Sequence, residues 1–484
     1  MTTTIIFVYL GMVLSIGLLS NRLFRGTGED YFVASRSIGP FLLLMSLFGT
    51  NMTAFAILGA SGEAYHSGIG VFALMPSGSA LIIPVIFFFI GTRVWALGKK
   101  HDFLTQVQYF RQRWESDGFG LLLFIVMIAL LIPYLLIGVM GGGLTLAQVT
   151  KGEIPQWAGG LLVCLVVLTY VSFGGMRGTA WANAFQTMVF MVLGGIAFFV
   201  IVDKLGGLDN AMAQVAAKHS NLLIRGDHIS PIKMLTYTCM PLSVGMFPHL
   251  FTHWLTAKSA RTFRWPLMFY PLCIAVVWLP SVLLGIFGHL DFPGLKGPAA
   301  NSVLVKMIDM HAPGVLAGLL AAGVFAAIMS SLDSQVLSIS NMFTQDIVRH
   351  YRKDSELSEK DQVLWGRLFV FFIFAVAYGL SLVSARSIFT LAVWSFTGFA
   401  SLFPIIVAAL FWRRSSKVGA FASVITVAVL WSYFFFQGWK VPGYTVGMTG
   451  VMPVAVILTA SAAAMVIGSL MSKPPKETTL EKFF

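Results

Sequence analysis

The chain has 484 residues, of which 57% are hydrophobic and only 11% are charged. A soluble domain of this length needs far more charged surface, so the composition indicates an integral membrane protein and excludes an ordinary soluble enzyme. The net charge of +12 does not indicate a nucleic-acid partner, because the basic residues lie in short clusters between apolar runs. The three cysteines lie inside apolar runs and lack the spacing of metal ligands.

Thirteen apolar runs are long enough to cross the membrane, since a helix needs about 20 residues to span the hydrocarbon core. They lie near residues 4–20, 40–62, 70–92, 119–147, 156–173, 179–202, 231–254, 266–288, 313–346, 365–384, 388–411, 418–437 and 450–471. The first run lacks a basic leading segment and a small-residue cleavage site, so we expect a membrane span there and not a signal peptide.

The basic residues predict the orientation of the chain. Thirteen spans place the termini on opposite sides, and an outer N-terminus puts most lysines and arginines in cytoplasmic loops, as the positive-inside rule requires. These residues are Arg22, Arg25, Arg36, Arg93, Lys99, Lys100, Arg111, Arg113, Arg177, Lys258, Arg261, Arg264, Arg349, Arg352, Lys353, Lys360, Arg367, Arg413, Arg414, Lys417, Lys473, Lys476 and Lys482. The longest outer segments, 203–230 and 289–312, are expected to be polar connectors. We predict a single multi-pass domain, 1–484, in the inner (plasma) membrane, as a monomer or loose oligomer.

The second and seventh spans are predicted to be broken. The second contains Gly49, Thr50, Asn51 and Thr53, and the seventh contains Pro241, Gly245 and Pro248, followed by His249 and His253. Backbone breaks at membrane depth survive only where they line a cavity or are buried in protein. Counted from the second span, these two spans begin successive groups of five, and such paired breaks indicate a binding site near the middle of the membrane. The alternative is that the small residues only permit close helix packing.

The ninth span combines hydroxyl groups with a carboxylate. Asp333 is the acidic residue that we place well inside a span, and a charge at that depth is costly unless it is paired or hydrated. Ser330, Ser331 and Ser334 are spaced three or four residues apart and share one helix face. A row of hydroxyls opposite the free carbonyls of a broken helix suits a hard cation such as sodium. The alternative is hydrogen bonding between helices.

Four stretches of the sequence resemble the sodium:solute symporters, relatives of the sodium/glucose, proline, pantothenate and sialic acid carriers. They are Glu29–Pro40, Gly174–Gly175 with Trp181–Gln186, Thr256–Ser259, and Ala326–Ser334 continuing to Phe343–Ile347. The resemblance implies an all-α membrane fold of the leucine-transporter type with two inverted repeats of five helices. Its parts would be an extra helix at 4–20, the repeats at 40–202 and 231–411, and two final helices at 418–471.

The resemblance also implies the residues that bind sodium. They are the carbonyls of Gly49, Met52 and Ala327 and the hydroxyls of Ser330 and Ser331. Asn183 is a departure, because the family often has aspartate at that position, where it helps some members to bind a second sodium with groups at the positions of Asp333 and Ser334. Three interpretations stay open: a second cation site at Asn183, Asp333 and Ser334, a proton acceptor at Asp333, or a structural brace.

The solute is less closely defined by the sequence. At positions where sugar carriers of the family hold hydroxyl groups, this chain has Ala56, Met75, Gly78 and Pro248, and their side chains make no hydrogen bond. An organic acid or amino acid is therefore favoured over a sugar. The candidate substrate residues are Asn51, Thr53, Ala56, Met75, Pro248 and His249. His249 either contacts an anionic group or donates a structural hydrogen bond.

The resemblance implies sodium-coupled symport of a small organic solute across the lipid bilayer by alternating access. A proton-coupled symporter of the same fold and a transporter-like membrane sensor are the alternatives. We expect no catalytic residues, no nucleic-acid partner, and Na+ as the ion required.

Overall fold

The computed structural model describes residues 2–20, 34–226, 229–352, 358–384, 386–439, 441 and 443–484. Within these residues the chain is helical, with a single isolated bridge between Ile38 and Ala257 and no strand. Residues 29–33 of the first signature lie outside the described residues, as do Arg22, Arg25 and Lys353 of the predicted cytoplasmic clusters.

The first part of the chain contains the helices up to residue 204. They are α1 Thr2–Ser20, η2 Ala34–Arg36, α3 Pro40–Asn51, η3 Phe55–Gly59, α4 Ala60–Ser67, α5 Gly70–Leu74, α6 Pro76–Ile86, η4 Phe87–Gly91, α7 Thr92–His101, α8 Gln106–Arg113, α9 Asp117–Val149 and α10 Gln156–Lys204. The predicted spans at 156–173 and 179–202 both lie in α10, which is interrupted at Gly175 (φ 55°, ψ −163°). Glycine adopts this backbone conformation without the steric cost of a side chain.

The remaining helices follow an outer connector. They are α11 Leu208–Lys218, η5 Ser220–Leu223, α12 Pro231–Tyr237, η6 Met240–Gly245, α13 Pro248–Leu255, η7 Ala260–Phe263, α14 Arg264–Asp291, η8 Gly297–Ser302, α15 Val303–His311, α16 Gly314–Met342, η9 Phe343–Arg349, α17 Glu359–Val383, α18 Ile388–Ser401, α19 Phe403–Phe411, α20 Lys417–Gly438, η10 Val446–Met448, α21 Pro453–Leu470 and α22 Glu477–Phe483.

The connectors predicted at 203–230 and 289–312 contain short helices that the sequence analysis did not expect. These segments contain α11 and α15, and α15 buries Val303, Leu304 and Ile308 against the body of the protein. The helices are short and amphipathic, so their apolar residues alternate with polar ones and do not stand out as apolar runs.

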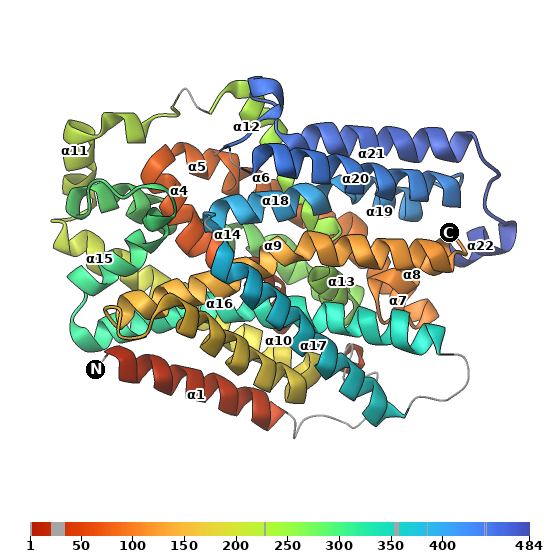
Figure 1. Ribbon diagram of the computed structural model, residues 1–484, viewed down its shortest axis with the longest axis horizontal. Helices are drawn as coiled ribbons and strands as arrows, with labels where there is room; N and C mark the ends of the chain where they lie inside the picture. The colour runs from red at the N-terminus through yellow and green to blue at the C-terminus, as the bar shows by residue number, and fades with distance from the viewer. Residues whose placement is uncertain are drawn as a thin grey trace.

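The described residues contain nine helices long and apolar enough to cross a membrane, or ten if the bent pair α3 and η3–α4 counts as one span. All thirteen predicted runs coincide with helices, but several are too short or too broken to meet that criterion, so the number thirteen stays a prediction. Figure 1 shows the long helices side by side along the long axis, with the two chain termini at opposite ends.

Helix α16 forms the centre of the bundle. In the most apolar stretch of the span Gly314–Arg349, which contains α16, 83% is buried, whereas in that of α17 only 28% is buried. Helix α16 is therefore enclosed, and α17 faces outward. Helices α1, α3, α9, α10 and α13 all pack against α16. A helix that is buried all round can carry polar groups only if neighbouring helices satisfy them. Some polar residues of α16 bond neighbouring helices, as Ser330 and Asp333 do, and others bond carbonyls of α16 itself, as Ser338 does.

Two breaks flank this central helix, as the sequence predicted. Helix α3 ends at Asn51 and the chain resumes helical structure at Phe55 after a bend of 58°. The seventh predicted span is divided into α12, η6 and α13, and Pro248 begins α13. Proline at the first position of a helix lacks the N–H that would otherwise be unpaired there, and it cannot continue the preceding segment.

Candidate functional site

The break in the second span lies directly against the serine row of α16. The last carbonyls of an α-helix have no partner within the helix, so the end of α3 at Asn51 leaves such groups at membrane depth. The Ser330 hydroxyl donates a hydrogen bond of 2.9 Å to the Gly49 carbonyl. At the last residue of the same helix, the Tyr134 hydroxyl donates to the Asn51 carbonyl at 3.3 Å. Two freed carbonyls of α3 thus point at side chains from two other spans.

The other predicted sodium ligands lie close to this contact. Ser330 also approaches the Ala327 carbonyl at 3.1 Å, and the Ser331 hydroxyl donates to the Ile328 carbonyl at 3.0 Å. Met52 is the residue at which the backbone leaves the helix, with φ −92° and ψ 91°. All of these residues are buried. The structure thus brings the Ser330 hydroxyl to the carbonyls of Gly49 and Ala327, whereas the Ser331 hydroxyl bonds within its own helix.

Gly49 is required by the close approach of α3 to α10. A Cβ at this position would lie 2.1 Å from the Thr187 Oγ1 and 3.3 Å from the Asn183 carbonyl oxygen. Real Cβ atoms do not approach other atoms so closely, so a side chain here would push α3 away from α10. The absence of a side chain at Gly49 fixes the position of its carbonyl relative to Ser330.

The second predicted cluster is also assembled. The Asn183 side chain on α10 donates to the Ser334 hydroxyl at 2.7 Å, and that hydroxyl donates to the Asp333 carboxylate at 3.1 Å. All three side chains are at most 1% exposed. The predicted trio Asn183, Asp333 and Ser334 is thus one hydrogen-bonded group.

Two members of this second cluster were missed by the sequence analysis. The Tyr170 hydroxyl on α10 donates to the other Asp333 oxygen at 2.9 Å, and His253 Nε2 on α13 lies 3.2 Å from the Ser334 hydroxyl. Tyrosine occurs in many membrane helices as a packing residue, and nothing in the local sequence of Tyr170 singles it out. His253 was named with the second break but was assigned no role.

Five of the six candidate substrate residues lie in the two broken spans, and Met75 lies at the junction of α5 and α6. The Asn51 side chain donates to the Tyr270 hydroxyl at 2.8 Å, and the Thr53 hydroxyl accepts the backbone N–H of Phe55 at 2.9 Å. Ala56 is fully buried in η3. The side chains of Asn51 and Thr53 thus already have hydrogen-bond partners within the protein, so both have a structural role.

His249 differs from these residues because its ring has no polar partner. It is fully buried, and within the described part of the chain neither ring nitrogen makes a hydrogen bond. Its ring lies 4.9 Å from that of Phe247 and 5.9 Å from that of Tyr134. Buried polar groups without a partner are rare in native proteins, and each one needs an explanation such as a water, an ion or a ligand.

An aromatic cluster connects the two breaks. The Phe396 ring on α18 lies 5.2 Å from Phe55, 5.2 Å from Tyr134 and 5.5 Å from Phe247, measured between ring centroids. Phe55 follows the first break, and Phe247 immediately precedes α13 in the second. Pro248 lies between Phe247 and His249, whereas Met75, at the junction of α5 and α6, is not part of the cluster. The sequence analysis missed Tyr134 and Phe396.

The fold and these contacts can now be compared with known proteins. The Sodium:solute symporter family model matches residues 31–426 of this chain. The chain belongs to the sodium:solute symporter family. The prediction from the sequence motifs is thus confirmed. This symporter is a membrane transporter and not an enzyme.

The similar proteins include both sequences and solved structures. The sodium/proline symporter of Escherichia coli (strain K12) is 25% identical over 95% of this chain and 93% of its own length. The osmoregulated proline transporter OpuE of Bacillus subtilis (strain 168) is 24% identical over 94% and 92%. The solved structure of a Na+-coupled sialic acid symporter, in a substrate-bound outward-open state, superposes with a TM-score of 0.80 at 18% identity and covers 98% of both chains.

A more distant structure has the same fold. The transporter MhsT in complex with L-phenylalanine gives a TM-score of 0.54 at 14% identity and covers 90% of this chain. At this identity the likeness shows the fold alone. The predicted all-α fold of the leucine-transporter type is confirmed for this symporter.

Proposed function

We propose that this symporter binds sodium between the second and ninth spans and carries a small organic acid or amino acid with it. The observation that carries the proposal is the Ser330 hydroxyl held 2.9 Å from the Gly49 carbonyl across two separate spans. The proposed ligands are the carbonyls of Gly49, Met52 and Ala327 with the hydroxyls of Ser330 and Ser331. Hard cations prefer oxygen ligands of this kind.

The coupling follows from where these ligands lie. Gly49 and Met52 belong to one repeat and Ser330 to the other, so a sodium ion that bridges them stabilises only the conformation in which the helices are close. A ligand shifts a conformational equilibrium by its difference in affinity for the two states, and by no more. Sodium then leaves toward the cytoplasm, driven by its concentration gradient and by about 2.3 kcal/mol per charge for each 100 mV of membrane potential.

The solute class is proposed from the side chains near the breaks. The fully buried His249 ring, which lacks a polar partner within the described residues, is placed to donate a hydrogen bond to a carboxylate. The aromatic cluster of Phe55, Tyr134, Phe247 and Phe396 provides apolar surface beside it. Such a site offers few groups for the several hydroxyls of a sugar, which supports an organic acid or an amino acid. The relatives named as proline carriers agree with this class.

A proton-coupled symporter is the second candidate, and Asp333 is the observation that favours it. This buried carboxylate accepts hydrogen bonds from Tyr170 and Ser334, and no lysine or arginine of the described segments pairs with it. A buried carboxylate with no cationic partner is stabilised either by a bound cation or by a proton. A second cation site at Asn183, Asp333 and Ser334 is the corresponding proposal for sodium.

We place the protein in the plasma (inner) membrane with its N-terminus outside. The described basic loops gather at the end that carries α8 and α22, where Arg113 reaches the Ser415 hydroxyl at 2.8 Å and Arg413 pairs with Glu477 at 3.3 Å. The positive-inside rule makes this end cytoplasmic.

The test is uptake into proteoliposomes with labelled proline and a panel of organic acids, amino acids and sugars. Sodium and choline buffers are compared over a range of pH. We expect uptake that requires sodium and generates current. The double variant Ser330→Ala with Ser331→Ala should lose the sodium dependence, and unchanged uptake kinetics in that variant would refute the site. Uptake that follows the pH gradient in choline would favour the proton-coupled candidate.

A further inference from the structure

Helix α8 closes one end of the bundle by holding the second broken helix. The Gln106 side chain donates to the Met246 carbonyl at 3.1 Å, in the segment between η6 and α13. One turn further along α8, the Tyr109 ring lies 6.0 Å from the Phe251 ring of α13. Both α8 residues are at most 1% exposed. Movement of α8 away from the bundle would therefore release α13 at the end proposed to be cytoplasmic.

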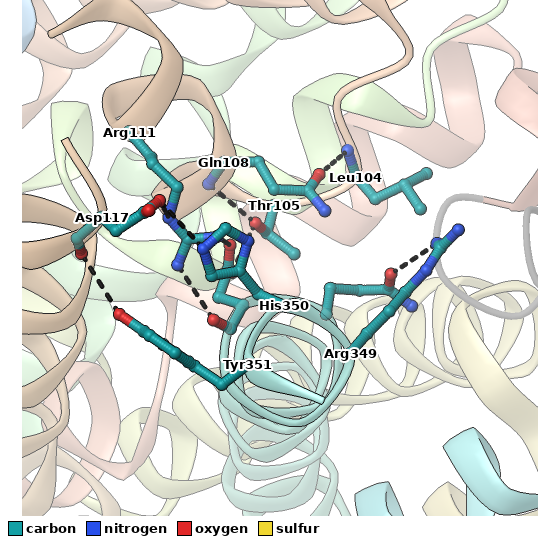
Figure 2. Close-up of polar contacts among 10 residues, drawn as sticks. Leu104, Thr105, Gln108, Arg111, Asp117, Arg349, His350 and Tyr351 are labelled. Carbon is teal, nitrogen blue, oxygen red and sulfur yellow. Dashed lines mark hydrogen bonds and ion pairs between the residues drawn. The ribbon is translucent and has the colours of Figure 1, made fainter. Parts of the chain in front are cut away.

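The same short helix holds η9, the segment that continues the serine-bearing α16. Thr105, which caps α8, donates to the Asp346 carboxylate at 2.6 Å. Arg111, which is labelled in Figure 2, donates to the Asp346 carbonyl at 2.9 Å, and its guanidinium lies 3.6 Å from the carboxylate. Asp346 is fully buried. Because α8 contacts both α13 and η9, the continuation of α16, it joins the solute-side and sodium-side spans at this end.

Helix α22 lies beside α8 at the same end of the bundle (Figure 1). Its Phe483 ring is 5% exposed and lies 5.6 Å from the Tyr109 ring and 6.1 Å from the Phe103 ring. The Thr479 hydroxyl donates to the Glu115 carboxylate just after α8, and Lys476 pairs with the other Glu115 oxygen at 2.9 Å. The α22 segment therefore contacts α8 through apolar rings, and it contacts Glu115, just after α8, through polar groups.

The start of the same segment is fixed to a different part of the protein. Glu477 pairs with Arg413 at 3.3 Å, and the Ser472 carbonyl accepts a hydrogen bond from Arg414 at 2.7 Å. Arg413 and Arg414 lie in the turn between α19 and α20. The segment 472–484 thus bridges α8 to the α19–α20 turn, two parts that are far apart in the sequence.

A cavity of about 880 Å³ lies beside α8 and α22. It is lined by residues of α8, η9 and α22, among them Gln108, Arg111, His350 and Lys482. On this side α8 is therefore not backed by close-packed protein, and the contacts of α22 replace that packing. Loss of those contacts leaves α8 held by its hydrogen bonds to Met246, Asp346 and Ser415, beside a cavity into which it can move.

We propose that α8 is the cytoplasmic gate of this symporter and that α22 is a strap that holds the gate closed. In the closed state Gln106, Tyr109 and Asp346 fix α8 to α13 and η9, and Phe483 with Glu115 fixes α22 to α8. Release of α22 favours the inward-open conformation. The inference rests on the proposed orientation and extends the proposed transport cycle by naming the element that must move to release sodium and solute.

The test measures exposure of the segment beneath the gate. Met246 is fully buried, so Met246→Cys reports opening through its rate of reaction with a membrane-impermeant maleimide added to inside-out vesicles. Labelling of the parent protein, which retains Cys164, Cys239 and Cys273, is subtracted. We expect Phe483→Ala to raise the labelling rate about tenfold, equivalent to about 1.4 kcal/mol. Met471→Ala, a similar truncation at a site 82% exposed, serves as the matched control and leaves the rate unchanged.

A second variant covers the case in which Phe483→Ala does not fold. Glu115→Cys and Thr479→Cys, joined by a short bis-maleimide, fix α22 to α8, and uptake should fall at least tenfold compared with a mono-maleimide control. Equal labelling of Phe483→Ala and Met471→Ala, or full uptake after cross-linking, would overturn the strap. The labelling assay needs neither sodium nor solute, so it stands even if the proposed solute is wrong. Labelling from the opposite face would instead show that the proposed orientation is wrong.

Discussion

Replacement of Ser330 by alanine tests the proposed sodium site most directly. In this structure the hydroxyl donates to the Gly49 carbonyl at 2.9 Å, a hydrogen bond worth about 0.5–1.5 kcal/mol. In the sodium-bound state the same oxygen would contact a charge, an interaction worth roughly 1.5–3 kcal/mol. Alanine removes both, so the net loss is about 1–2 kcal/mol of binding free energy. Sodium affinity should therefore fall roughly 5- to 30-fold.

The assay is the sodium concentration for half-maximal uptake, measured in proteoliposomes at saturating solute. Ser338→Ala is the matched control, because Ser338 lies on the same helix, is 2% exposed, and donates at 2.6 Å to the Ser334 carbonyl of its own helix. That control should retain the sodium affinity of the parent. An unchanged sodium requirement in Ser330→Ala, or an equal loss in both variants, would contradict the assignment of the ion to this hydroxyl.

Three further predictions concern other contacts of the structure. Gly49→Ala places a Cβ 2.1 Å from Thr187 Oγ1, so the melting temperature should fall with a destabilisation of roughly 1–3 kcal/mol, and Thr187→Ala should restore part of it. Tyr170→Phe removes a donor from the buried Asp333, and thermal unfolding should show a loss of about 1–3 kcal/mol. The Thr479 hydrogen bond and the Lys476 ammonium hold the pKa of Glu115 below its usual value of 4.5. The folded-state pKa is therefore the lower one, so the contribution of Glu115 to α22 docking is present above about pH 4.5 and is lost as the pH falls through the folded-state pKa. Hydrogen exchange of residues 477–483, corrected for its intrinsic rate, should rise in acid, and this rise should be absent in Glu115→Gln.

The local features of the site could be predicted from the sequence because each has a local cause. Glycine and polar residues at 49–53 weaken a membrane helix, and proline at 241 and 248 removes backbone donors, so both breaks follow from the residues themselves. The serines of α16 share a face because a helix repeats every 3.6 residues. These regularities do not depend on where the helices lie relative to one another.

The partners across helices could not be predicted in the same way. Tyr170 and Asp333 are 163 positions apart, and Thr105 and Asp346 are 241 apart. No periodicity links such residues, and the apolar runs around them are compatible with several arrangements of the bundle. Asp346 lies near the end of its span, so the sequence analysis quoted it within the ninth-span signature but assigned it no role.

The sequence by itself determined that this chain resides in a membrane, which two spans are broken and which face of the ninth span carries hydroxyls. Those properties follow from transfer free energies and from the geometry of single helices. Only the tertiary structure decided that Tyr170 donates to Asp333, that His253 lies beside Ser334, and that α22 covers α8. Each of these contacts depends on the packing of segments distant in sequence, and packing is fixed by the shapes of all the side chains together.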